Sequence, residues 1–201
     1  MAQTVFFRSE GLKLEALLSR DSGNCAVVVT HPHPLYGGEM HNPVVEATTR
    51  AYQKIGYSTL RFNFRGVGNS RGNYDDGKGE GQDVLAALSY LYEMGFKKID
   101  LAGYSFGAWV NAHVDPCAAG YERMVMVSPP VAFMDFSKVS ALPQLALVVA
   151  GSRDDIGPPD KIRQYLPGWN PTARFEIIPE TDHFYSGALD ALEGVLTKAL
   201  P

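Results

Sequence analysis

The chain has 201 residues, of which 45% are hydrophobic and 20% charged, a composition that suits one globular domain spanning residues 1–201. The formal net charge of −4 and the absence of a lysine or arginine cluster argue against a nucleic-acid partner. No apolar segment approaches the ~20 residues that a membrane-spanning helix requires, and the N-terminus lacks the pattern of a secretory signal, so we expect a cytoplasmic protein without a membrane partner.

Segments typical of strands and helices alternate along the chain. Two strands are predicted first, joined by a turn, and the apolar run CAVVVT then indicates a strand buried on both faces. Asn42 followed by Pro43 predicts the start of a helix that ends at Gly56. The predicted strands are 4–8, 12–19, 25–30, 57–64, 99–104, 123–128, 144–151 and 173–179, and further helices are predicted at 80–94, directly after Ser105, at 158–166 and at 187–200.

This alternation predicts an α/β fold. Strands separated by helices of this length form a mostly parallel sheet with helices on both faces, and the first two strands would add an antiparallel edge hairpin. In such sheets the reactive groups gather beyond the carboxyl ends of the strands. The residues that follow each predicted strand are therefore the candidates for a functional site.

The segment GYSFG, residues 103–107, places a glycine two positions before and two positions after Ser105. A buried strand has no use for these glycines, because each gives up side-chain packing and adds backbone entropy. A strand that turns sharply into a helix does need them, and such a turn presents the serine hydroxyl at its apex. Ser105 is thus a candidate nucleophile, with an ordinary loop serine as the alternative.

An acid and a histidine follow two other predicted strands. Asp154 lies just beyond strand 144–151, and His183 lies just beyond strand 173–179. A serine hydroxyl needs a base to accept its proton during attack, and histidine can do so near neutral pH. A buried carboxylate would hold the imidazole in the correct tautomer. Ser105, Asp154 and His183 are therefore predicted to form a catalytic triad.

The chain resembles the α/β-hydrolase superfamily over nearly its full length. The segments HPHPLYGGEMHN, LRFNFRGVGNSRG, GYSFG and GSRDDI resemble a group of small bacterial predicted hydrolases or esterases without a cap domain, related to dienelactone hydrolases and serine aminopeptidases. The resemblance implies Ser105 as nucleophile, Asp154 as acid and His183 as base. In the family pattern the acid follows a glycine and two residues, which favours Asp154 over Asp155; Asp182 is too close to His183 in sequence to orient it.

The loop HPHPLYGG follows the first buried strand, where this fold places half of its oxyanion hole. The backbone N–H of Phe106, next to the nucleophile, would supply one donor. The second must come from the loop, and Pro32 and Pro34 have no N–H. Leu35 is the predicted second donor, with Tyr36 as the alternative.

Only about 15 residues separate the strands at 123–128 and 144–151, too few for the helical cap of larger relatives, so a shallow, open site is expected. Phe133, Met134 and Phe136 are predicted to form an apolar wall, with Tyr36 and Phe184 opposite. Core packing is the alternative for these side chains.

The loop after strand 57–64 carries arginines and glycines but no phosphate-binding motif. Arg65 and Asn63 are predicted to brace the nucleophile turn, and Asp83 to lie early in the following helix, where a carboxylate suits the helix dipole.

No cofactor and no metal are expected. The two cysteines, Cys25 and Cys117, are not spaced for a metal site and are predicted to be free thiols. A metal site at His31, His33 and His41 is the alternative, but no nearby cysteine or acid clearly completes it.

Three functions fit these features. The preferred one is a serine hydrolase that cleaves short-acyl esters or thioesters of small molecules. The second uses the same triad on amides or peptides, as aminopeptidases do, and the third is a non-catalytic binding module. The sequence leaves a homodimer open beside a monomer.

Overall fold

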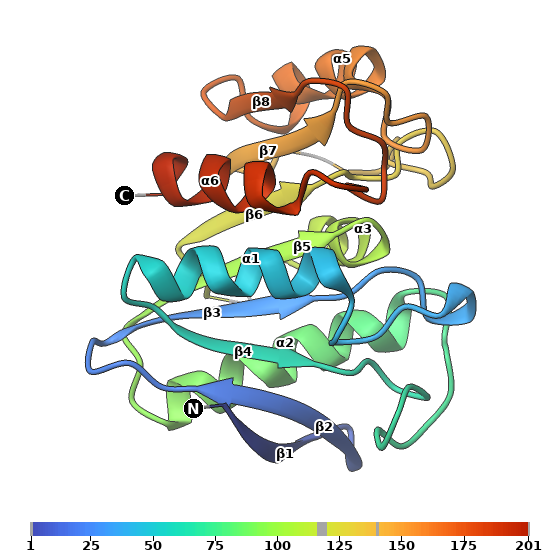
Figure 1. The fold of residues 1–201 in the computed structure, drawn as a ribbon. Coiled ribbons are helices and arrows are strands. Elements are labelled where there is room, and N and C mark those ends of the chain that lie inside the picture. Colours follow the sequence, from blue (N-terminus) through green and yellow to red (C-terminus); the bar gives the residue numbers. More distant parts are fainter. Residues whose placement is uncertain (1, 116–119, 140, 201) are drawn as a thin grey trace.

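The computed structural model describes residues 2–115, 120–139 and 141–200 and places them in one mixed sheet with helices on both faces (Figure 1). The strands are β1 (Gln3–Ser9), β2 (Leu12–Ser19), β3 (Cys25–Thr30), β4 (Ser58–Phe62), β5 (Lys98–Tyr104), β6 (Arg123–Val127), β7 (Leu145–Gly151) and β8 (Arg174–Ile178). The helices are the 3-10 turn η1 (Pro34–Tyr36), α1 (Pro43–Lys54), α2 (Lys78–Glu93), α3 (Phe106–His113), α5 (Pro159–Trp169) and α6 (Leu189–Ala199).

The sheet has the order β1-β2-β4-β3-β5-β6-β7-β8. Strands β1 and β2 pair antiparallel, β2 also pairs antiparallel with β4, and all pairs from β4 through β8 are parallel. This confirms the predicted α/β fold with an antiparallel N-terminal hairpin. The carboxyl ends of the parallel strands therefore meet along one edge of the sheet.

The two faces of the sheet are covered by different helices (Figure 1). Val27 and Val29 of β3 pack toward α1 and α6, whereas Val28 belongs to the core beneath α2, α3 and α5. Successive side chains of a strand point to opposite faces, so both halves of this apolar run are buried. The predicted two-sided burial of residues 25–30 is confirmed.

A few boundaries differ from the predictions for local reasons. Helix α2 begins at Lys78 because the Glu80 carboxylate accepts the backbone N–H of Gly77 at 2.8 Å, closing the first turn. Strand β4 ends at Phe62, and the side chain of Asn63, the next residue, accepts the N–H of Met40 at 2.9 Å. The turn η1 was not predicted.

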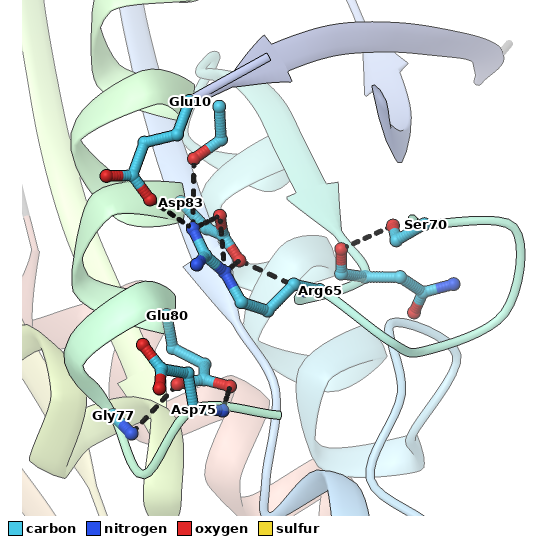
Figure 2. Close-up of polar contacts among 9 residues, drawn as sticks. Glu10, Arg65, Ser70, Asp75, Gly77, Glu80 and Asp83 are labelled. Carbon is cyan, nitrogen blue, oxygen red and sulfur yellow. Dashed lines mark hydrogen bonds and ion pairs between the residues drawn. The ribbon is translucent and has the colours of Figure 1, made fainter. Parts of the chain in front are cut away.

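A buried ion pair fixes the loop after β4 (Figure 2). Arg65 Nη2 lies 2.8 Å from Asp83 Oδ1, and the Arg65 backbone N–H donates to Asp83 Oδ2 at 3.0 Å. The same guanidinium reaches Glu10 of the β1–β2 turn at 3.1 Å. Arg65 thus ties α2 to the N-terminal hairpin rather than bracing the nucleophile turn, and Asp83 is a buried ion-pair partner rather than a helix-dipole residue.

Cys25 is half-buried with a free thiol, and Cys117 lies outside the described residues. Among the helices of the described ranges, none combines the length and the apolar character needed to span a bilayer.

Candidate functional site

Ser105 sits in the tight turn between β5 and α3, with φ +53° and ψ −119°. A β-carbon on Gly103 would lie 2.6 Å from the backbone nitrogen of Ala108, and one on Gly107 would lie 2.5 Å from Thr30 Oγ1. Neither contact is tolerable, so both positions require glycine. The structure therefore has the strand-to-helix turn that the GYSFG segment predicts.

The three predicted triad side chains meet at the carboxyl edge of the sheet. His183 Nε2 lies 3.0 Å from Ser105 Oγ, and His183 Nδ1 lies 2.9 Å from Asp154 Oδ1 and 3.0 Å from Asp154 Oδ2. All three residues are buried. Such a chain of hydrogen bonds can move the serine proton to the imidazole and stabilise the imidazolium that results.

Asp154 is held as a carboxylate by its surroundings. Burial alone would raise its pKa, but hydrogen bonds from His183, the Gly157 N–H and the Ser128 hydroxyl outweigh it and hold the pKa below its usual range. Asp154 Oδ1 also accepts the N–H of Ile156 at 3.0 Å. Asp155 is exposed at the surface.

Three hydroxyl groups that support the site were missed by the sequence reasoning. Ser128, directly after β6, bonds to Asp154 and lies 3.0 Å from the hydroxyl of Tyr185. The Tyr104 hydroxyl donates to the backbone carbonyl of His183 at 3.0 Å. Ser128 follows the carboxyl end of β6, but the predicted strand 123–128 included it, so the rule that found Ser105 passed over it.

The loop between β3 and α1 does not present the predicted second oxyanion donor. The N–H of Leu35 donates to His33 Nδ1 at 3.2 Å, and the N–H of Tyr36 donates to the carbonyl of His33 at 3.1 Å. Both predicted groups are used inside the turn η1. This structure does not favour the prediction of Leu35, because its N–H already has an acceptor.

Two other backbone N–H groups near Ser105 have no hydrogen-bond acceptor among the described residues. Within the described ranges, the backbone N–H groups of His33 and Phe106 donate to no protein acceptor. The rings of these two residues are 4.7 Å apart, and both residues line the cavity over Ser105. Free N–H groups of residues that line a cavity over a serine hydroxyl can bind a developing negative charge.

The three histidines of the metal alternative have separate roles. His31 is fully buried; its Nδ1 lies 2.7 Å from the Pro32 carbonyl oxygen and its Nε2 accepts the Phe64 N–H at 3.0 Å. His33 Nδ1 accepts the Leu35 N–H, and His41 is exposed beside Glu46. In the part of the chain that the structure describes, no three acidic, histidine or cysteine side chains form a metal-binding group.

His31 makes folding sensitive to acid. Burial lowers the pKa of its imidazole from 6.5 to about 4, so the unfolded chain binds a proton that the folded chain does not. Below pH 6.5 stability is expected to fall with pH and to level off near pH 4, a loss of about 3 kcal/mol from this group. His31→Gln keeps a neutral acceptor for the Phe64 N–H but removes the titrating group. Between pH 7 and 4, the free energy of unfolding of this variant should therefore fall by about 3 kcal/mol less than that of the wild type, as measured by urea unfolding. Equal losses in both proteins would contradict this.

A cavity of about 600 Å³ opens above Ser105. Its walls include the predicted residues Phe133, Met134, Tyr36 and Phe184. Phe136 does not reach it: the ring is buried in the core, 5.1 Å from the ring of Trp169. The prediction for Phe136 is corrected because the short segment after β6 turns inward there.

Comparisons with known proteins agree with this geometry. No family model matches the chain. An uncharacterized protein of Rickettsia prowazekii is 32% identical over 196 residues, which cover 92% of this chain and 82% of that protein. An α/β serine hydrolase homologue from Coxiella burnetii is similar in structure, with a TM-score of 0.92, 32% identity and coverage of 99% of this chain and 97% of that one.

A second solved structure is an α/β serine hydrolase without a lid from Xanthomonas campestris. It has a TM-score of 0.91 and 29% identity, covering 99% of this chain and 93% of that one. Its lack of a lid matches the short connection between β6 and β7. The chain therefore belongs to the α/β-hydrolase superfamily, among its serine hydrolases that lack a lid.

Proposed function

We propose that the protein hydrolyses small carboxylic esters, either short-acyl oxygen esters or thioesters, through an acyl-enzyme formed on Ser105. The observation that carries this proposal is the hydrogen-bonded order of Ser105 Oγ, His183 and Asp154, with separations of 3.0 and 2.9 Å. The open cavity above Ser105 gives a small substrate access to the hydroxyl.

In the first half of the reaction, Ser105 Oγ attacks the acyl carbon while His183 Nε2 takes the hydroxyl proton. The carbonyl oxygen becomes an oxyanion in a tetrahedral intermediate. When the intermediate collapses, the bond to the alcohol or thiol breaks and His183 gives its proton to that leaving group. Asp154 stabilises the imidazolium throughout and remains a carboxylate.

The oxyanion would be bound by the N–H groups of Phe106 and His33. Each donor of this kind contributes about 3–4 kcal/mol to the transition state. His33 replaces Leu35 in this role because the Leu35 N–H is engaged within its own loop, whereas the His33 N–H has no protein acceptor in the described chain.

In the second half, a water molecule gives a proton to His183 and attacks the acyl carbon. The new tetrahedral intermediate expels Ser105 Oγ, which recovers the proton from His183, and the carboxylic acid leaves. The same three side chains therefore serve both halves.

Amide cleavage is the second candidate function. An aminopeptidase would need a group that binds the substrate amine, and no carboxylate lies among the described residues that line the cavity. The third candidate, a binding module, would not need a serine, histidine and aspartate in hydrogen-bonding order. Esters are therefore the better supported substrates.

Matched substrates test the proposal. We expect the protein to hydrolyse p-nitrophenyl butyrate and to act at least about 100-fold more slowly on butyryl p-nitroanilide, which has the same acyl group and a poorer leaving group. Prior treatment with a fluorophosphonate should abolish the ester activity. Anilide turnover equal to ester turnover would favour the amidase, and no turnover with no inhibition would favour the binding module.

A further inference from the structure

On the condition that the proposed ester hydrolysis is correct, we infer that the substrate carries no charge near the scissile bond, on either its acyl or its alcohol side. The inference rests on the composition of the cavity wall and on the commitments of its polar groups. It narrows the substrate class from small esters in general to neutral apolar esters.

The cavity over Ser105 is lined by aromatic, aliphatic, glycine and uncharged polar residues. No aspartate, glutamate, lysine or arginine occurs among the described residues of its wall. A charged substrate group placed there would lose its water without gaining an ion-pair partner. The free-energy cost of moving a charged group from water into an apolar environment is several-fold larger than that of moving a neutral polar group.

The polar groups in the wall are largely used by the protein. The Tyr104 hydroxyl donates to the His183 carbonyl, and Asn42 Oδ1 accepts the Val44 N–H at 2.9 Å. His33 Nδ1 accepts the Leu35 N–H, and burial lowers the pKa of the His33 imidazole, which keeps it neutral. These groups therefore offer little compensation to a carboxylate or an ammonium ion.

The rim of the cavity is apolar and exposed. Tyr36, Phe133 and Phe184 are 87%, 74% and 65% exposed, although large aromatic side chains are usually buried. All three line the cavity, on segments that follow three different strands. Exposed apolar side chains gathered around one cavity mark a surface that binds an apolar ligand.

The acyl side is tested with diethyl succinate and monoethyl succinate, which differ only by replacement of one ester with a carboxylate. At pH 7.5, with rates normalised to alkaline hydrolysis of each ester, we expect kcat/KM for the monoester to be lower by about 30-fold or more. Equal values, within about threefold, would overturn the inference. Turnover of p-nitrophenyl butyrate with none of diethyl succinate would also overturn the inference, because a neutral ester would then not be a substrate, whereas no turnover of all three esters would overturn the proposed function.

The alcohol side is tested with choline pentanoate and its neutral isostere 3,3-dimethylbutyl pentanoate. The neutral ester is expected to have the higher normalised kcat/KM, by about tenfold or more. The aromatic rim offers one physical route to the opposite result, because aromatic faces also attract quaternary ammonium groups. A preference for the choline ester would therefore overturn the inference on this side.

A variant locates the selectivity in the cavity wall. Phe133→Lys places an ammonium group at an exposed rim position. It should raise the ratio of kcat/KM for monoethyl succinate to kcat/KM for diethyl succinate by about fivefold or more. Ser22→Lys is the matched control, since it adds the same charge in the exposed loop before β3, at the opposite end of the sheet. If the ratio rose equally in both variants, the net charge of the protein and not the cavity wall would set the selectivity. That result would overturn the assignment of the selectivity to the cavity wall.

Discussion

Replacing Asp154 by asparagine is expected to lower kcat for ester hydrolysis by about ten-thousand-fold. The amide keeps the size of the carboxylate, so the fold should persist, but it removes the negative charge beside His183 Nδ1. It can also hold the imidazole in the tautomer with Nε2 protonated, which leaves no lone pair to accept the Ser105 proton. Steady-state kinetics on p-nitrophenyl butyrate measures the loss.

Asp155→Asn is the matched control, because it makes the same chemical change one residue away at the surface. Its kcat should stay within about threefold of the wild type. If the two variants exchanged their effects, Asp155 would be the acid and the hydrogen bonds of Asp154 to His183, at 2.9 and 3.0 Å, would have no catalytic meaning.

Asp83→Asn is expected to lower the free energy of unfolding by about 3–5 kcal/mol. The Asp83 side chain is fully buried and that of Arg65 is 9% exposed, so the substitution leaves the guanidinium buried without its main counter-charge. The Asp83 carboxylate also accepts the Arg65 backbone N–H, which fixes the loop after β4 (Figure 2). Urea unfolding measures the effect, and we expect the dependence of the unfolding free energy on urea concentration (the m-value) to be the same in the variant and the wild type.

Glu10→Gln removes the other carboxylate that contacts Arg65. The Glu10 side chain is 58% exposed, and an ion pair with such a partner contributes less than about 1 kcal/mol. The contrast between the two variants separates the effect of burial from the effect of charge. Similar losses in both would contradict the account of this ion pair.

The strands and the meeting of Ser105, Asp154 and His183 could be predicted because each leaves a local pattern. The run CAVVVT is apolar from Cys25 to Val29 because β3 is covered on both faces. The reactive residues Ser105, Asp154 and His183 each follow a strand, and a parallel sheet brings those strand ends together. The position of residues at strand ends thus brought together His183 with Ser105, 78 positions away in the chain, and with Asp154, 29 positions away.

The remaining details depend on contacts that leave no local pattern. The Leu35 N–H is lost as an oxyanion donor because the His33 side chain folds back to accept it, which only the turn η1 reveals. The contacts of Phe136 and Asp83 were not foreseen, because their partners, Trp169 and Arg65, lie far away in sequence. Hydrophobicity and charge alone do not say which distant residue a side chain meets.

Mass spectrometry after treatment with one equivalent of a fluorophosphonate tests the central claim most directly, since only an activated serine reacts. We expect one adduct per chain, located on Ser105 by peptide mapping, and no adduct in Ser105→Ala. An adduct on another residue, or an unmodified wild-type protein, would contradict the claim.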